Sequence, residues 1–258
     1  MANVALIAGA GWKGAACRIS IVPPKTPEFL LPLITCPELL LPLGDGSTVL
    51  SRLAGQLQDR GFSLFISVGG PGCLFPTAAR HYGGHRTLIT KEAVRAGQVV
   101  SPWTEERIRY VQQFGCVVRQ PNPDIGNCHT SFCSLIDAAG KGWDRWLLLC
   151  GDMVISNKLL DETLSYPSSC WFRLKDQILW LDSDGLKDYS SVACADSKTT
   201  SYDAGMAAKA RIKALYKSWR SGAILFLDES ELGHGTECVE IDHTYMYPEA
   251  LDWISKNG

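Results

Sequence analysis

The chain has 258 residues, of which 46% are hydrophobic and 20% charged, and its formal net charge is −2. This is an ordinary balance for a globular protein long enough to bury a sizeable core, and it gives no electrostatic sign of a nucleic-acid or membrane-surface partner. No apolar run reaches the roughly 18 residues of a transmembrane helix, and no secretory signal is recognisable, so we expect a cytoplasmic protein.

The first predicted element is a strand at residues 3–8, a continuous apolar run that ends in glycines, as buried parallel strands do. Six prolines between residues 23 and 42 exclude a regular helix there. Further strands are expected at 63–68, 115–119, 145–150, 223–227 and 237–241. Helices are expected between the cap Ser47 or Thr48 and the stop Gly61, from Ser101-Pro102 to about Phe114, at 130–139, at 203–219, and from Pro248 onward.

Apolar stretches on both sides of Lys175-Asp176 predict a β-hairpin. Before this hairpin, strands and helices alternate, which favours βαβ units. We therefore expect an α/β fold with a Rossmann-like mixed, mainly parallel sheet flanked by helices. No linker divides the chain, so residues 1–258 are predicted to form one domain, with 165–200 as a hairpin and acceptor-site region.

The ten cysteines contain no CxxC pair. Cys128 and Cys133, with His129 between them, form the closest cluster, but the second ligand pair of a zinc site is missing. Several others lie inside apolar runs. The pattern is typical of reduced cysteines that fill the core.

A glycine-rich segment follows the first strand, with Gly9, Gly11 and Gly14 in the spacing GxGxxG. Glycines let backbone N–H groups approach phosphate oxygens closely, and Lys13 and Arg18 can add positive charge. A NAD-binding Rossmann turn would need a helix and a second strand next, and the prolines leave no room for them. A glycine turn without a ligand is the bland alternative.

Several segments, in chain order, resemble the sugar-phosphate nucleotidylyltransferases and their relatives that make CDP-choline-type products. They are IAGAGWKG with Arg18, PELLLPLGDGSTVLSRL at 37–53, PNPDIGNCHTSFCSLIDAA at 121–139, LLLCGDMVIS at 147–156 and CVEIDHTYMYPEALDWI at 238–254. The chain departs from the family at Glu38, where the family has a lysine that contacts phosphate.

The resemblance implies a GT-A-like nucleotide-diphospho-sugar transferase fold and a Mg²⁺ ion held by Asp152 and Asp242. It also implies transfer of a nucleotidyl group from an NTP to a phosphorylated acceptor, with release of pyrophosphate. The implied nucleotide-binding residues are Ala8, Gly9, Gly11, Gly14, Gly126 and Asn127. The implied catalytic cations are Lys13, Arg18 and Lys25, one of which would replace the missing lysine.

Two other functions remain open at this point. A GT-A glycosyltransferase would hold its metal through a D-x-D motif, which Asp182-Ser183-Asp184 matches literally, although D-S-D-G is also an ordinary turn composition. A non-catalytic protein that binds nucleotides or sugar phosphates would explain Glu38. The sequence does not identify the NTP or the acceptor, and it is compatible with a homo-oligomer.

Overall fold

The computed structural model describes residues 2–9, 36–69, 103–120, 128–173, 177–194, 224–228, 237–241 and 246–257. The helix predicted at 203–219 lies outside these ranges. Within them, no helix is long and apolar enough to span a membrane.

A seven-stranded sheet in the order β3-β2-β1-β4-β7-β6-β8 forms the centre of the molecule. Its strands are β1 (Asn3–Ala8), β2 (Ser63–Gly69), β3 (Cys116–Gln120), β4 (Arg145–Cys150), β6 (Ser169–Arg173), β7 (Gln177–Leu181) and β8 (Ile224–Asp228). β1 pairs in parallel with both β2 and β4, β2 with β3, and β6 with β8. Only β7 runs antiparallel to its neighbours β4 and β6. The predicted mixed, mainly parallel sheet and the hairpin are confirmed.

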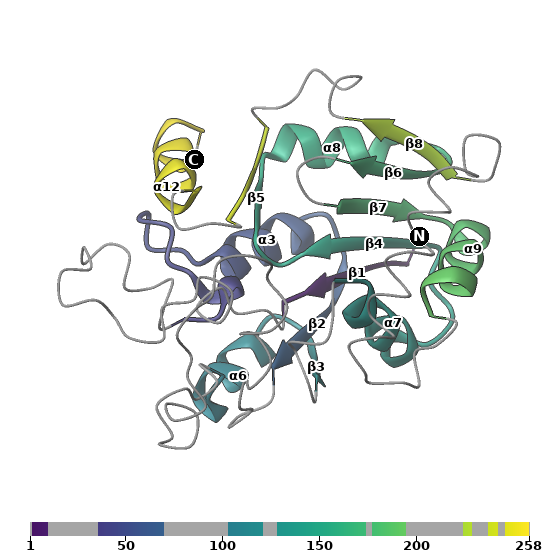
Figure 1. Ribbon diagram of the computed structural model, residues 1–258, viewed down its shortest axis with the longest axis horizontal. Helices are drawn as coiled ribbons and strands as arrows, with labels where there is room; N and C mark the ends of the chain where they lie inside the picture. Colours follow the sequence, from purple (N-terminus) through teal and green to yellow (C-terminus); the bar gives the residue numbers. More distant parts are fainter. Residues whose placement is uncertain are drawn as a thin grey trace, which may run out of the picture.

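Strand direction gives the sheet two different edges (Figure 1). β1, β2, β3, β4 and β6 all end at one of them, which we call the carboxyl edge and define by Ala8, Gly69, Gln120 and Cys150. β7 ends at the opposite amino edge, where Leu181 pairs with Trp146 near the start of β4. Ligands of open α/β sheets bind at the carboxyl edge, so this edge positions the site.

Six α-helices accompany the strands in the described ranges. They are α3 (Val49–Gln58), α6 (Glu105–Gln112), α7 (Cys128–Ala139), α8 (Asn157–Ser165), α9 (Ser183–Ala193) and α12 (Met246–Asn257). The chain passes from β1 to β2 through α3 and from β2 to β3 through α6, moving toward one side of the sheet. It then passes from β3 to β4 through α7, which moves in the opposite direction. Right-handed crossovers therefore put α7 on the face opposite α3 and α6.

Helix boundaries follow the side chains that cap them. Thr48, one of the two expected caps, is the N-cap of α3 and forms a reciprocal capping box with Ser51. The expected start of α6 at Ser101-Pro102 is wrong, because Thr104 is the N-cap and its hydroxyl accepts the Arg107 N–H at 3.2 Å. α12 begins at Met246, two residues before the predicted Pro248.

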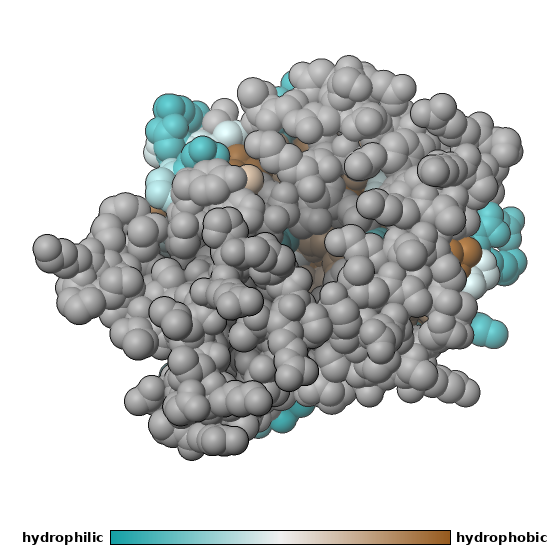
Figure 2. All heavy atoms as spheres, in the orientation of Figure 1, coloured by the Kyte–Doolittle hydropathy of each residue, from teal (hydrophilic) through white to brown (hydrophobic). Residues whose placement is uncertain are grey.

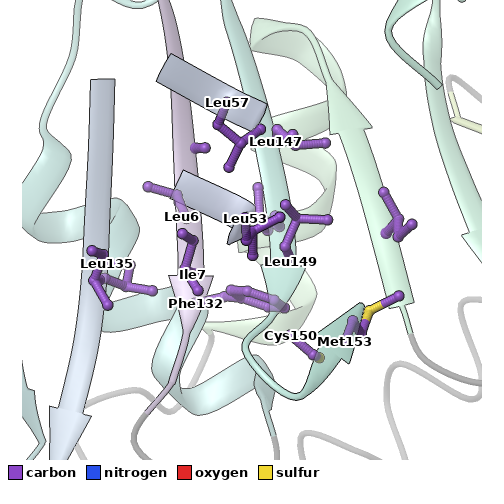
Figure 3. Packing of buried hydrophobic residues seen from close by; sticks show 14 of the residues in the cluster. Leu6, Ile7, Leu53, Leu57, Phe132, Leu135, Leu147, Leu149, Cys150 and Met153 are labelled. Carbon is purple, nitrogen blue, oxygen red and sulfur yellow. The ribbon is translucent and has the colours of Figure 1, made fainter. Parts of the chain in front are cut away.

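The main core lies between the sheet and its helices (Figure 3). Leu6 and Ile7 of β1 are fully buried together with Leu147 of β4, so the central strands are covered on both faces. Side chains from α3 and from α7 complete the cluster; those labelled in the figure are Leu53, Leu57, Phe132 and Leu135. On the face shown in Figure 2, the described residues at the margins are mostly hydrophilic, with small hydrophobic patches between them.

A two-stranded sheet forms a smaller second layer beside α12 (Figure 1). β5 (Met153–Ile155) follows β4 directly and pairs antiparallel with β9 (Cys238–Glu240). Its buried cluster consists of Leu41, Leu43, Val49, Val154, Ile241, Tyr247, Ala250 and Ile254. The Tyr247 hydroxyl donates to the Pro42 carbonyl at 2.5 Å, and burial raises the pKa of this tyrosine to about 12.

A disulfide joins Cys133 of α7 to Cys194 at the end of α9, with 5.6 Å between their Cα atoms. The expectation that the cysteines are reduced is therefore wrong for this pair, because two helices 61 residues apart in the sequence pack side by side. His129 Nδ1 shares a hydrogen bond of 2.8 Å with the Tyr189 hydroxyl and joins the same two helices. The described residues contain no cluster of three or more potential metal ligands.

Candidate functional site

The chain leaves the sheet at the end of β1 in a fixed way. Ala8 lies in register with Ser67 of β2 on one side and with Cys150 of β4 on the other. At the next residue, the Gly9 N–H takes no part in the backbone pairing of the strands. It donates instead to the side-chain Oγ of the buried Ser67, at 3.0 Å. The start of the glycine-rich segment is thus anchored to the carboxyl edge.

Two glycines lie in close contact with their neighbours at this point. The Gly151 N–H donates to the Ala8 carbonyl at 2.9 Å, and a Cβ on Gly151 would lie 2.9 Å from both the Ala8 oxygen and the Gly9 Cα. A Cβ on Gly9 would lie 2.5 Å from Leu39 Cδ2. At Gly151 the short contacts are with backbone atoms, so this position requires glycine. At Gly9 the Leu39 side chain would have to shift, and the Ser67 carbonyl oxygen would lie a tight 3.1 Å from the added Cβ.

Leu39 connects the proline-rich segment to these two strand ends. Its side chain is fully buried and reaches Gly9 with one methyl group and Gly151 with the other. It belongs to a short 3-10 helix, η2 (Glu38–Leu40), which follows Pro37. The segment PELLLPL therefore packs against the carboxyl edge rather than lying in solvent.

Asp152 follows β4 at the same edge and is only 8% exposed. Its backbone carbonyl accepts the Ile241 N–H at 2.9 Å, continuing the pairing of β5 with β9. Asp242 follows Ile241 in the sequence and lies outside the described residues. A buried carboxylate is the kind of oxygen ligand that Mg²⁺ takes, so Asp152 fits the implied ion.

Gln120 is a candidate that the sequence analysis missed. It ends β3 in register with Gly69, is 7% exposed, and its Nε2 has no hydrogen-bond partner among the described residues. A buried amide donor without a partner is costly, and a ligand at the carboxyl edge would remove that cost. The sequence signal was a glutamine between an apolar strand and a proline.

Glu38 begins η2 and is half-buried, next to the residue that touches both glycines. The position that the sequence resemblance aligns with a lysine of the family therefore lies beside the candidate site and carries a carboxylate here. Among the described cations, Arg107 reaches this segment, with its guanidinium 3.7 Å from the Cys36 sulfur.

The structure brings Ala8, Gly9 and Asp152 together at the carboxyl edge. The other predicted site residues lie outside the described ranges: Gly11, Lys13, Gly14, Arg18, Lys25, Gly126, Asn127 and Asp242. α7 begins directly after Asn127.

The D-x-D alternative does not reach this edge. Asp182 follows β7 at the amino edge, and its carboxylate caps α9 by accepting the Asp184 and Gly185 N–H groups at 3.1 and 2.8 Å. The turn interpretation is corrected as well, since Ser183 and Asp184 begin a helix. Burial acts to raise the pKa of Asp182, but the Gly185 N–H, the Ser169 hydroxyl and the charge of Arg145 lower it overall.

Comparison with known proteins identifies the fold. No protein-family model matches the sequence, and no curated protein matches it either. Solved structures do match. An apo UDP-glucose pyrophosphorylase is 12% identical with a TM-score of 0.53, over 99% of each chain. UDP-glucose pyrophosphorylase complexed with UDP-glucose is 12% identical with a TM-score of 0.52, over all of each chain. The inositol-1-phosphate CTP transferase from T. maritima is 14% identical with a TM-score of 0.49, over 99% of this chain and 97% of that one. The chain therefore has the α/β fold of these UDP-glucose pyrophosphorylase structures, the class of fold that the sequence resemblance implied.

Proposed function

We propose that this chain is a Mg²⁺-dependent nucleotidyltransferase that joins the NMP unit of an NTP to a small phosphorylated acceptor and releases pyrophosphate. One observation carries the proposal: the buried Asp152 is bonded through its backbone to Ile241, the residue before Asp242, at the edge where Gly9 leaves the sheet. The chain thereby brings Asp152 and Ile241, the residue before Asp242, together near Gly9, and we assign Asp242 to the same site.

In this proposal Asp152 and Asp242 hold the ion, which would neutralise phosphate oxygens as charge develops on them. Gly9, with Ala8, Gly11 and Gly14, presents backbone to the triphosphate. The acceptor phosphate attacks the α-phosphate in line, and pyrophosphate leaves. The chain needs no general base, because an acceptor phosphate is already ionised near neutral pH.

Other residues bind and orient the nucleotide. Lys13, Arg18 and Lys25 are the proposed cations for the phosphates, in place of the lysine missing at Glu38. Gly126 and Asn127, which precede α7, are proposed to contact the nucleotide. The Gln120 amide both donates and accepts hydrogen bonds, which suits the edge of a nucleobase at the end of β3.

A sugar 1-phosphate is the first acceptor class to test, because one structure with this fold is complexed with UDP-glucose. β6 also ends at the carboxyl edge, so we assign the acceptor side to the β6–β7 hairpin within residues 165–200 of a single 1–258 domain. Phosphocholine-like acceptors are the second class. A cytoplasmic location belongs to the same proposal.

The second candidate is a non-catalytic protein that binds nucleotides or sugar phosphates. Glu38 favours it, because a carboxylate beside Leu39 repels phosphate where the family has a lysine. If the chain has this second function, it binds an NTP and releases no pyrophosphate with any acceptor.

The test is a pyrophosphate-release assay with each of the four NTPs, Mg²⁺, and sugar 1-phosphates or phosphocholine. We expect turnover by the wild type and loss of at least about 100-fold in Asp152→Asn, the scale of removing a preorganised charge contact. Asp182→Asn is the matched control, an aspartate at the other edge of the sheet, and it should keep wild-type activity. Wild-type activity in Asp152→Asn would refute the metal assignment.

A further inference from the structure

Ser67 is a polar residue in an otherwise apolar strand. It is fully buried between Ile66 and Val68, which are also fully buried. Its backbone takes part in the sheet through its register with Ala8 and with Val118. The hydroxyl is therefore not needed for strand pairing, and a small apolar residue would fit β2 equally well.

The hydroxyl acts on Gly9 instead. At Gly9 the backbone leaves the β1 ladder, and its N–H would be buried without an acceptor if Ser67 Oγ did not take it at 3.0 Å. Leu39 closes the Cβ side of Gly9, and Gly151 packs against its Cα. Ser67 thus completes a three-sided enclosure that fixes the orientation of the Ala8–Gly9 peptide.

We propose that Ser67 is a positioning residue for nucleotide binding. Its hydroxyl holds the Ala8–Gly9 peptide, and so sets the direction in which this peptide is presented to the triphosphate. This inference rests on the proposed function, since it gives Ser67 a role in the same site. The residue touches no reacting group and acts only through Gly9.

A second serine supplies a control with the same chemistry. Ser169 is also fully buried, and its Oγ accepts a strand-end N–H, that of Asp182, at 2.8 Å. This bond lies at the amino edge, at the opposite ends of the strands from Gly9. Ser67→Ala and Ser169→Ala therefore each remove one buried acceptor of a backbone N–H, and only the first removes it from the proposed site. Ser169→Ala also removes the hydroxyl that hydrogen-bonds to the Asp182 carboxylate.

The experiment compares wild type, Ser67→Ala, Ser67→Thr and Ser169→Ala by thermal unfolding and by steady-state kinetics with NTP and acceptor varied separately. We expect both alanine variants to lose Tm, with Ser169→Ala losing at least as much as Ser67→Ala. Only Ser67→Ala should raise the KM for the NTP, by about tenfold, which corresponds to about 1.4 kcal/mol. Its KM for the acceptor should stay within about twofold. Ser67→Thr keeps the hydroxyl and should restore the KM for the NTP.

The outcomes separate the two proposals. An active wild type with an unchanged KM for the NTP in Ser67→Ala refutes the role of Ser67 and leaves the function standing. An equal rise in both KM values, or an equal rise in Ser169→Ala, shows a general structural effect and also refutes it. A folded wild type that neither binds nor turns over any NTP refutes the proposed function and the inference together.

Discussion

Gly151→Ala probes the contact between the end of β4 and the end of β1. The added methyl group would lie 2.9 Å from the Ala8 carbonyl oxygen, the Gly9 Cα and Leu39 Cδ1. Leu39 can rotate, but the other two atoms belong to the backbone, so the strand ends must move apart. Overpacking of this kind costs about 1–3 kcal/mol. For a chain of this size, that lowers Tm by about 2–4 °C per kcal/mol.

The same displacement should affect activity more than stability. Gly9 and Asp152 flank the contact, and a shift of about 1 Å in a catalytic arrangement costs about 100-fold in rate. Urea unfolding measures the first effect and pyrophosphate release the second. Gly55→Ala is the control, because its Cβ would meet nothing within 4 Å and it lies inside α3. We expect it to be neutral or to stabilise the helix by up to about 1 kcal/mol. A Gly151→Ala protein as stable and as active as Gly55→Ala would refute the close-packing argument.

Three further predictions concern single features. Asp182→Ala removes the α9 cap and should lower the free energy of unfolding in urea by about 1 kcal/mol, whereas Asp182→Asn should retain most of the stability that the cap provides. Because the pKa of Asp182 is lowered in the folded state, its ionised carboxylate stabilises the protein above the unfolded pKa near 3.9, and this stabilisation is lost as the pH falls through the folded pKa. The same pH dependence should be absent in Asp182→Asn. Reduction of the Cys133–Cys194 disulfide should lower the free energy of unfolding by about 4 kcal/mol, because the bond restricts the entropy of the 61-residue loop in the unfolded chain. A count of ten free thiols in the denatured, unreduced protein would contradict the bond. Gln120→Leu should leave stability unchanged or slightly higher, because it removes a buried donor that has no partner among the described residues, yet it should raise the KM for the NTP. An unchanged KM would exclude Gln120 from the site.

The sheet was predictable because its signals are local. Apolar runs at 3–8, 63–68 and 145–150 match β1, β2 and β4 within a residue, and the hairpin around 174–176 is also confirmed. Ser101-Pro102 resembled a helix start, but the Thr104 hydroxyl provides the actual cap. α8 and α9 were not predicted. α9 begins at D-S-D-G, whose composition suits a turn and a helix cap equally well, and tertiary packing against α7 decides between them.

The site was predictable where it depends on strand ends and unpredictable where it depends on contacts between distant residues. Ala8 ends an apolar run, and Gly9 and Asp152 come just after one, so their place at one edge could be inferred. The bond from Gly9 to Ser67 joins residues 58 positions apart, and no local pattern announces it. The Cys133–Cys194 bond likewise depends on the packing of two helices.

The contact between Gly9 and Leu39 has a consequence for how such chains can vary. These residues bound a stretch of 29 intervening positions, and the structure holds its two ends against each other. The entropic free-energy cost of closing a flexible chain segment grows only with the logarithm of its length, by about 0.6 kcal/mol for each doubling. Residues can therefore be added between the two ends at little cost while β1, Leu39 and Asp152 keep their places.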